Sequence, residues 1–337
     1  MQVQPVPLPT SPTHEPRFYV IRHATRFRYS SAISESVMEL RMCPRTATHQ
    51  RTLSFHASTN PRAQLFEYTD HLQNIVHHFN ITRQHKQLFI NVEAVVQQSP
   101  TLDLPPSLTL EHWQKLDQMV QTSDYWEMLQ PSYFAKPTDL LLALAQEFGL
   151  SRQQDPLTTL RLLTSQVYHT FQYTPNATQV DSPIDDALRL RKGVCQDFSH
   201  VMISLCRWLG IPARYVSGYL FHREQETRVA NDATHAWVEA LLPDLGWVGF
   251  DPTANRMAGV QHIRVALGRD YEDVPPTKGI FRGTAESELS VAVQVLRVSE
   301  PNHLPPQQDL PFGSVRNLLQ PEAEPTASFQ YQQQQQQ

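Results

Sequence analysis

The feature that most constrains the fold of this chain is a change of hydrophobic period near residue 100. Before it, five segments are rich in Val, Ile, Phe and Thr and partly alternate between apolar and polar residues, which is typical of strands. They are Phe18–Arg22, Thr52–Ala57, Gln64–Thr69, Ile75–Ile81 and Gln87–Val96. The polar segment Asp70–Asn74 between two of them predicts a hairpin turn. Residues 17–98 are therefore expected to form an antiparallel β-domain, preceded by a flexible N-terminus over 1–16.

After a proline-punctuated stretch, the hydrophobic period becomes helical. Asp155 followed by Pro156 predicts the start of a helix, because Asp is a favoured N-cap residue and Pro fits the first helical position. Thr138 is expected to cap a second helix over Asp139–Phe148, which Gly149 ends. We assign residues 99–155 to a helical connector.

Residues 156–258 are expected to form a core of helices and strands. Directly after Gly193 and Val194, apolar residues recur on one helical face. They are Phe198, Val201, Met202, Leu205, Trp208 and Leu209. Strand-like runs follow at 213–219, 234–242 and 247–251. The expected fold class is α+β, with a helix packed on an antiparallel sheet and the β-domain before it.

The last part of the chain carries one more strand-like run, Leu289–Val298, within a C-terminal β extension over 259–300. The remainder, 301–337, is rich in Pro and Gln and ends in six glutamines, so it is expected to be disordered.

Charge and cysteine content narrow the class of protein. The 28 Lys and Arg residues against 33 Asp and Glu residues give a net charge of −5, which provides no reason to expect nucleic acid or a membrane as partner. The apolar run Leu140–Ala145 is far shorter than the ~20 residues that span a bilayer. No secretory signal is recognisable, and three cysteines favour a reducing compartment, so we expect a cytoplasmic protein. The sequence indicates no cofactor and leaves the oligomeric state open.

Cys195 is the candidate nucleophile. It lies in the first turn of the expected helix, where unpaired N–H groups and the positive end of the helix dipole favour a thiolate. Its own backbone N–H would also point at the oxygen of a bound carbonyl, forming half of an oxyanion hole.

His235 and Asp251 are the candidate base and its orienting partner, because a nucleophile needs both. His235 opens one expected strand and Asp251 closes the next. If the two residues face each other in an antiparallel hairpin, Ala240 pairs with Gly246 and 241–245 form a five-residue loop. Both side chains then emerge on one face, about 4.5–5.5 Å apart at Cβ.

Four ordered blocks resemble the transglutaminase-like core of bacterial proteins. They are Gly193–His200, Gly210–Tyr219, Thr234–Glu239 and Gly249–Thr253. Arg45 and the Asp70–Asn74 turn are similar to the N-terminal domain that accompanies this core, and Gly268–Val274 to the stretch that follows it. The resemblance implies a papain-like fold with Cys195 as nucleophile, His235 as general base and then acid, and Asp251 as the carboxylate that orients His235. It also implies acyl transfer from a peptide or protein amide through a thioester, to an amine or to water.

The chain departs from the family pattern at some positions. Animal transglutaminases have Gln-Cys-Trp around the nucleophile, whereas this chain has Val194-Cys195-Gln196. Neither their upstream tryptophan oxyanion donor nor their calcium sites can be placed here. Gln73 lies where the bacterial N-terminal domain usually has Gly in its turn.

Other residues of reactive type have plainer interpretations. Cys206 lies three helical turns after Cys195, roughly 16 Å away, and is expected in the core, while Cys43 is expected to be incidental. A metal site at His71, His77, His78 and His85 is not expected, because consecutive strand residues point to opposite faces. Trp237 and Trp247 fit a core or a substrate groove. Asp197 fits a first-turn carboxylate that the helix dipole favours, or a group that tunes the nearby thiolate.

Three functions remain open at this point. The first is an amidase, peptidase or acyltransferase that acts on γ-carboxamides or backbone amides. The second is acyl transfer from acetyl-CoA to arylamines, which uses the same Cys–His–Asp order. The third is a protein-binding module without activity. The sequence favours the first. The block Gly193–Phe198 and the N-terminal β-domain argue against the second, and the intact triad argues against the third. It leaves the substrate, the acyl acceptor, the second oxyanion donor and the role of the β-domain open, although we expect that domain to cover one edge of the cleft.

Overall fold

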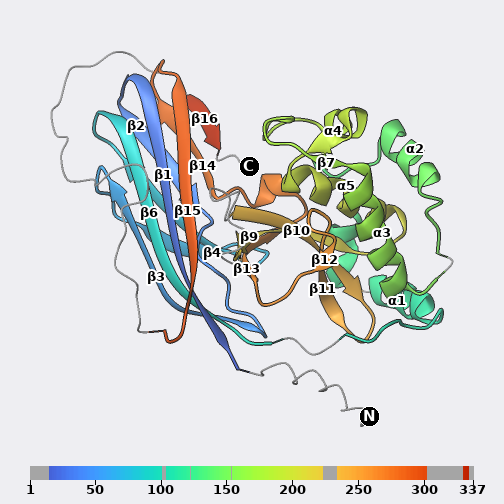
Figure 1. Ribbon diagram of the computed structural model, residues 1–337. Helices are drawn as coiled ribbons and strands as arrows, with labels where there is room; N and C mark the ends of the chain where they lie inside the picture. The colour runs from blue at the N-terminus through green and yellow to red at the C-terminus, as the bar shows by residue number, and fades with distance from the viewer. Residues whose placement is uncertain are drawn as a thin grey trace, which may run out of the picture.

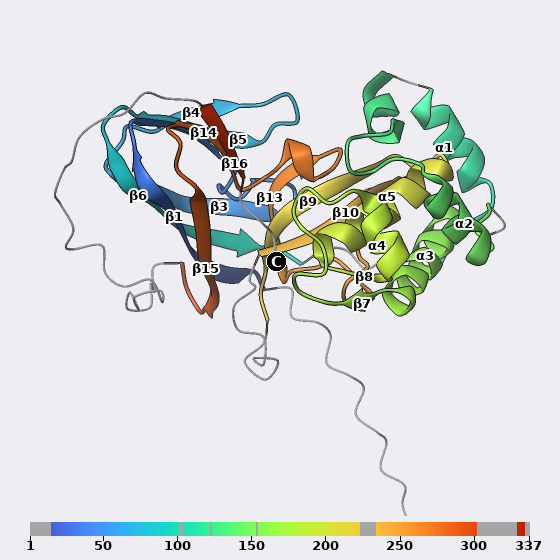
Figure 2. The same ribbon diagram turned by 90° about the horizontal axis from the view of Figure 1, so that it is seen from above.

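The computed structural model describes residues 15–100, 104–121, 123–152, 154–222, 234–301 and 329–333. Two parts lie side by side, a β-sandwich and a mixed part of helices and one sheet (Figure 1). Both views place strands of the mixed part between the sandwich and the helices (Figure 2). The α+β class predicted from the sequence is confirmed.

The sandwich consists of two antiparallel sheets around an apolar interior. The first sheet has the order β15 (Ser287–Val298), β1 (Arg17–Ile33), β6 (His85–Gln98), β3 (Gln50–Asn60). The second has the order β16 (Phe329–Gln333), β14 (Thr277–Arg282), β2 (Glu35–Leu40), β5 (Ile75–Ile81), β4 (Phe66–Thr69). Phe27, Phe79 and Phe281 from both sheets are almost fully buried between them. Alternating apolar residues on the inner faces therefore hold the two sheets together.

The sandwich is discontinuous in sequence. Strand β15 pairs along its whole length with β1, from Phe18–Val298 to Tyr29–Ser287, and β14 pairs with β2. The structure thus divides the chain differently from the boundaries predicted at 98, 258 and 300. Part of the expected C-terminal extension completes the sandwich, and another part, β13 (His262–Gly268), joins the sheet of the core.

The end of the chain also differs from its expectation. Phe329–Gln333 form β16, an edge strand that pairs with β14, so the prediction of a wholly disordered tail over 301–337 is wrong for these five residues. Backbone pairing with an open sheet edge explains the difference, because it does not depend on side-chain composition. The rest of the tail, and 1–14 of the expected flexible N-terminus, lie outside the described residues.

The mixed part packs helices against one face of a five-stranded sheet. The sheet has the order β12 (Arg256–Met257), β11 (Gly246–Asp251), β10 (Thr234–Leu242), β9 (Ala213–Leu220), β13. The helices are α1 (His112–Val120), η1 (Ser123–Leu129), α2 (Asp139–Glu147), α3 (Pro156–Thr170), α4 (Ile184–Leu190), α5 (Cys195–Trp208) and η3 (Tyr271–Asp273). A short parallel pair joins β7 (Gln172–Tyr173) to β8 (Lys192–Gly193). None of the helices in the described part of the chain has the length and apolar character needed to cross a membrane.

The predicted helix caps are confirmed. The Asp155 carboxylate accepts hydrogen bonds from the backbone N–H groups of Leu157 and Thr158 at 3.0 Å each, and Pro156 opens α3. The Thr138 hydroxyl accepts from the N–H of Leu141 at the start of α2. Gly149, with φ of +58°, follows that helix in the left-handed conformation that glycine adopts without strain.

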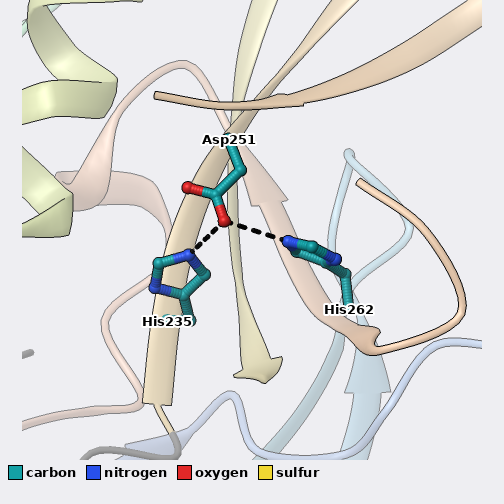
Figure 3. Close-up of side chains that lie close together, drawn as sticks. All are labelled: His235, Asp251 and His262. Atoms are coloured by element: carbon teal, nitrogen blue, oxygen red, sulfur yellow. Dashed lines mark hydrogen bonds and ion pairs between the residues drawn. The ribbon is translucent and has the colours of Figure 1, made fainter. Parts of the chain in front are cut away.

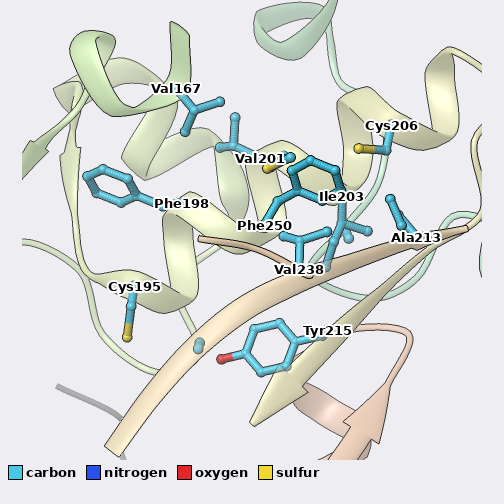
Figure 4. Packing of buried hydrophobic residues seen from close by; sticks show 14 of the residues in the cluster. Val167, Cys195, Phe198, Val201, Ile203, Cys206, Ala213, Tyr215, Val238 and Phe250 are labelled. Carbon is cyan, nitrogen blue, oxygen red and sulfur yellow. The ribbon is translucent and has the colours of Figure 1, made fainter. Parts of the chain in front are cut away.

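Helix α5 is the buried centre of the mixed part. Phe198, Val201 and neighbouring apolar residues pack against Phe250 and Val238 of the sheet (Figure 4). Five of the six residues predicted on its apolar face are buried, but Trp208 is 49% exposed, so that assignment is wrong. Trp208 is the last residue of α5.

Candidate active site

The turn before Cys195 is fixed by a carboxylate. Asp197 accepts a 2.8 Å hydrogen bond from the N–H of Val194 and a 2.6 Å bond from the hydroxyl of Thr178. A Cβ at Gly193 would lie 2.5 Å from the same carboxylate oxygen, so only glycine fits there. Asp197 is thus a carboxylate in the first turn, as expected, and its side chain caps the start of α5. Burial raises its pKa against the effect of these hydrogen bonds.

Cys195 is the first residue of α5 and is 1% exposed. Its sulfur points away from the apolar side chains that anchor the rest of the helix (Figure 4). Cys43 and Cys206 are also free, and burial raises the pKa of each of their thiols to about 12. Those two thiols are therefore poor nucleophiles at neutral pH.

His235 and Asp251 meet as predicted, although through a different register. Nε2 of His235 lies 2.9 Å from Oδ2 of Asp251. The predicted pairing of Ala240 with Gly246 is wrong, because Leu242 occupies that place and only three residues form the loop.

The reason for the shift lies in the turn, and its size explains why the two residues still meet. Asp244 and Gly246 take left-handed φ values of +63° and +70°, which makes a tighter turn than predicted. A shift of two residues keeps each side chain on its face of the sheet, whereas a shift of one would have reversed it. His235 and Asp251 become diagonal neighbours, still within reach of an imidazole.

Asp251 is fully buried and has four donors. Oδ1 accepts from the backbone N–H groups of Thr253 and Ala254 at 3.0 and 3.2 Å. Oδ2 is shared by the Nε2 atoms of His235 and His262, the second at 3.1 Å (Figure 3). Although burial opposes ionisation, the charge and hydrogen bonds of the two histidines hold the pKa of Asp251 well below its usual range. Asp251 is therefore a carboxylate at any pH near neutrality.

The hydrogen bonds assign the protons of both rings. Nδ1 of His262 accepts from the N–H of Gly259 at 3.2 Å, so its Nε2 carries the proton that is donated to Asp251. His235 likewise donates from Nε2, which leaves its Nδ1 for Cys195, to which it is hydrogen-bonded. Burial alone would lower the pKa of His235, but the charge of Asp251 and these hydrogen bonds raise it to about 10. The structure thus brings Cys195, His235 and Asp251 together as one hydrogen-bonded series.

The sequence was compared with known families and proteins. Residues 143–252 match the transglutaminase-like superfamily, and residues 19–97 match the bacterial transglutaminase-like N-terminal region. An uncharacterized protein of Mycobacterium leprae (strain TN) is 31% identical over 279 residues, which are 82% of this chain and 98% of that protein. The chain belongs to the transglutaminase-like superfamily. An uncharacterized protein of Mycobacterium tuberculosis (strain H37Rv) is 32% identical over 317 residues, covering 86% of this chain and 95% of its own.

Two further similarities concern the fold and a shared segment. A solved structure from Cytophaga hutchinsonii, named as a candidate cysteine protease, superposes with a TM-score of 0.67 at 19% identity, over 94% of this chain and 98% of that one. This likeness shows a shared fold. A protein-glutamine gamma-glutamyltransferase of Pseudomonas aeruginosa is 34% identical over 171 residues, which are 47% of this chain and 25% of that protein.

His262 is the residue of the candidate active site that the sequence analysis missed. It begins β13, which follows β12 in sequence but pairs with β9, at the other edge of the sheet. Local periodicity carries no signal for that crossover. A buried histidine at the start of an otherwise apolar strand was the one available hint.

His235, Asp251 and His262 also offer three potential metal-ligand atoms within 4.8 Å of one another. Their nitrogen–oxygen distances of 2.9 and 3.1 Å are hydrogen-bond lengths, and each nitrogen has a proton assigned by its neighbours. We therefore interpret the group as a hydrogen-bonded carboxylate between two imidazoles.

The other histidines and tryptophans considered in the sequence analysis each contact a different partner. His71 contacts Glu127, His77 contacts Glu67, His78 stacks on Phe66, and His85 bonds Ser36. Trp237 is fully buried against His262, and Trp247 lies under the guanidinium of Arg214 at 4.0 Å. Trp237 thus fits the core interpretation, whereas Trp247 is half-buried.

Proposed function

We propose that this protein catalyses cysteine-dependent acyl transfer on amide bonds of peptides or proteins. The observation that supports the proposal is the series Asp251–His235–Cys195, with the thiol in the first turn of a buried helix. An imidazole with a raised pKa accepts the thiol proton readily, and the resulting thiolate is the attacking species.

The reaction runs in two halves. In the first, the thiolate of Cys195 adds to the carbonyl carbon of the amide, and the backbone N–H of Cys195 stabilises the oxyanion. His235 then gives its proton to the leaving nitrogen, the C–N bond breaks, and a thioester remains. In the second half, His235 takes a proton from the acceptor, which attacks the carbonyl carbon of the thioester. The C–S bond breaks, the acyl group leaves on the acceptor, and His235 returns the proton to the sulfur of Cys195. Asp251 keeps the ring oriented and stabilises its charged form throughout.

Glutamine γ-carboxamides are the substrate that we favour. Nearly half of this chain is similar in sequence to a relative from Pseudomonas aeruginosa that bears the name protein-glutamine gamma-glutamyltransferase. An amine acceptor would then give transamidation, and water would give deamidation.

The test uses benzyloxycarbonyl-glutaminylglycine with and without hydroxylamine. We expect release of ammonia, formation of a hydroxamate when hydroxylamine is present, and loss of both in Cys195→Ala. Cys206→Ala is the matched control and should keep the activity, because that thiol lies in the core. Acetylation of an arylamine from acetyl-CoA, with no reaction of the glutamine peptide, would instead support the arylamine acyltransferase. No turnover of either donor together with an unreactive Cys195 would refute catalysis and favour a binding module.

A further inference from the structure

His262 has no part in the reaction as written, yet it is 3% exposed and completely bonded. Its ring donates to Asp251 at one nitrogen and accepts from Gly259 at the other. The ring also packs edge-on against Trp237, with centroids 5.1 Å apart. A buried polar side chain with both nitrogens committed has one orientation only. We propose that His262 is a positioning residue for the catalytic pair, and that the β-sandwich holds it in place.

The first step concerns the carboxylate. The backbone N–H groups of Thr253 and Ala254 hold Oδ1 of Asp251 but do not define where Oδ2 points. His262 defines it, because its Nε2–H donor approaches Oδ2 from the side opposite to His235 (Figure 3). Without that donor, the carboxylate is free to turn about its Oδ1 contacts. His235 would then lose part of the interaction that favours its charged form.

The second step concerns what holds His262. The side-chain amide of Gln98, from β6 of the sandwich, donates to the carbonyl oxygen of His262 at 3.0 Å. It also donates to Oε1 of Gln50 at 2.8 Å, and that oxygen accepts from the N–H of Arg264 at 2.8 Å. Nε2 of Gln50 donates to the carbonyl oxygen of Arg264 at 2.7 Å.

These contacts replace the missing neighbour of an edge strand. β13 pairs with β9 on one side, and on the other the two glutamine side chains bond to its backbone as a further strand would. Both glutamines are at most 2% exposed, so an unmade bond there would leave a buried polar group without a partner. The sandwich thereby fixes the backbone from which His262 reaches Asp251.

The charged and titratable groups around Asp251 come from four elements. They are Cys195 of α5, His235 of β10, His262 of β13, and Arg256 of β12, whose Nε lies 3.8 Å from Oδ2. Burial lowers the pKa of His262 despite its bond to Asp251, so the ring is a neutral donor at neutral pH. Its contribution is therefore directional and adds no charge to the site.

The inference rests on the proposed function, and its test needs no substrate. The rate of alkylation of Cys195 by iodoacetamide is measured against pH by peptide mass spectrometry. His262→Leu removes the donor, and the imidazolium that accompanies the thiolate becomes less stable. We expect the rate at pH 7 to fall about 10- to 100-fold, and its midpoint to rise by about one to two pH units. His262→Gln, which can donate from a side-chain amide, should restore most of the rate.

Gln98→Leu tests the contribution of the sandwich and should raise the midpoint in the same direction by a smaller amount. If His262→Leu does not fold, Gln98→Leu carries the test, because it should raise the midpoint while His262→Gln stays close to wild type. A lower thermal stability with an unchanged midpoint in every folded variant would overturn the inference and leave His262 a purely structural role. Slow alkylation of wild-type Cys195 that does not depend on His235 would instead refute the proposed function.

Discussion

Replacing Asp251 by Asn should deactivate Cys195 while keeping the shape of the site. The pKa of His235 is raised from 6.5 to about 10 even though burial opposes it. At about 1.4 kcal/mol per pKa unit, this difference is worth about 5 kcal/mol in favour of the charged ring. The asparagine side chain carries no charge, and its single amide oxygen cannot accept from both imidazoles and both backbone N–H groups, so burial would then dominate the pKa of His235.

The size of the effect follows from the proton affinity of the ring. A fall of at least about 3 pKa units makes proton transfer from Cys195 to His235 about 1000-fold less favourable. We expect alkylation of Cys195 by iodoacetamide near pH 7 to slow at least about 100-fold. The midpoint of the rate against pH should rise by at least about two units, since the thiolate loses its imidazolium partner.

Asp244→Asn is the matched control, because Asp244 lies exposed in the turn of the same hairpin and Asn tolerates its left-handed φ. It should leave the rate and the midpoint unchanged. An Asp251→Asn protein that is folded and alkylates at Cys195 with the wild-type pH profile would refute the reasoning, because the carboxylate would then have no influence on the ring.

Three other changes test the packing around the site. Gly193→Ala places a Cβ 2.5 Å from the Asp197 carboxylate, so we expect the free energy of unfolding in urea to fall by about 2 kcal/mol. Gly259→Ala is the control: its Cβ would meet open space, so the free energy of unfolding should fall much less. Glu239→Gln leaves two arginines without their buried carboxylate and should cost about 3 kcal/mol. The pKa of Glu239 is lowered by those arginines against the effect of burial, so its contribution is present above about pH 4.3 and is lost as the pH falls further. Acid unfolding followed by circular dichroism should therefore be less steep in Glu239→Gln than in wild type. Asn74→Ala removes two hydrogen bonds to the backbone of β13 and should lower the free energy of unfolding by about 1–3 kcal/mol. An unchanged melting temperature would contradict this expectation.

Local signals were sufficient for the helices and for the position of the nucleophile. The cap residue and the proline at the start of α3, and the glycine after α2, act on residues close to them in sequence. Such signals can therefore be recognised from the sequence alone. The placement of Cys195 at the start of α5 depends on the same kind of signal. The Asp70–Asn74 turn was also predictable, and Gln73 adopts a φ of +62° there, which explains why glycine is usual at that position.

Contacts between distant segments were not predictable from periodicity. The hairpin register was off by two residues because the turn conformation, not the apolar pattern, selects among registers that share a face. Strand β13 pairs with β9, and β15 pairs with β1. The hydrophobic pattern of a strand does not indicate which other strand it pairs with. His262 was missed for this reason, since it reaches Asp251 only through that arrangement.

The split sandwich has a consequence for how the chain is made. Strand β1 is synthesised before the mixed part, yet its neighbour β15 is synthesised only after all of it. Until then one edge of β1 stays open, and the early strands expose apolar surface that other chains can pair with. Pairing over such long separations also slows folding. The mixed part, inserted between the two halves, can form first and bring them together. We therefore expect chains that stop before β15 to aggregate, even where every residue of the candidate active site is present.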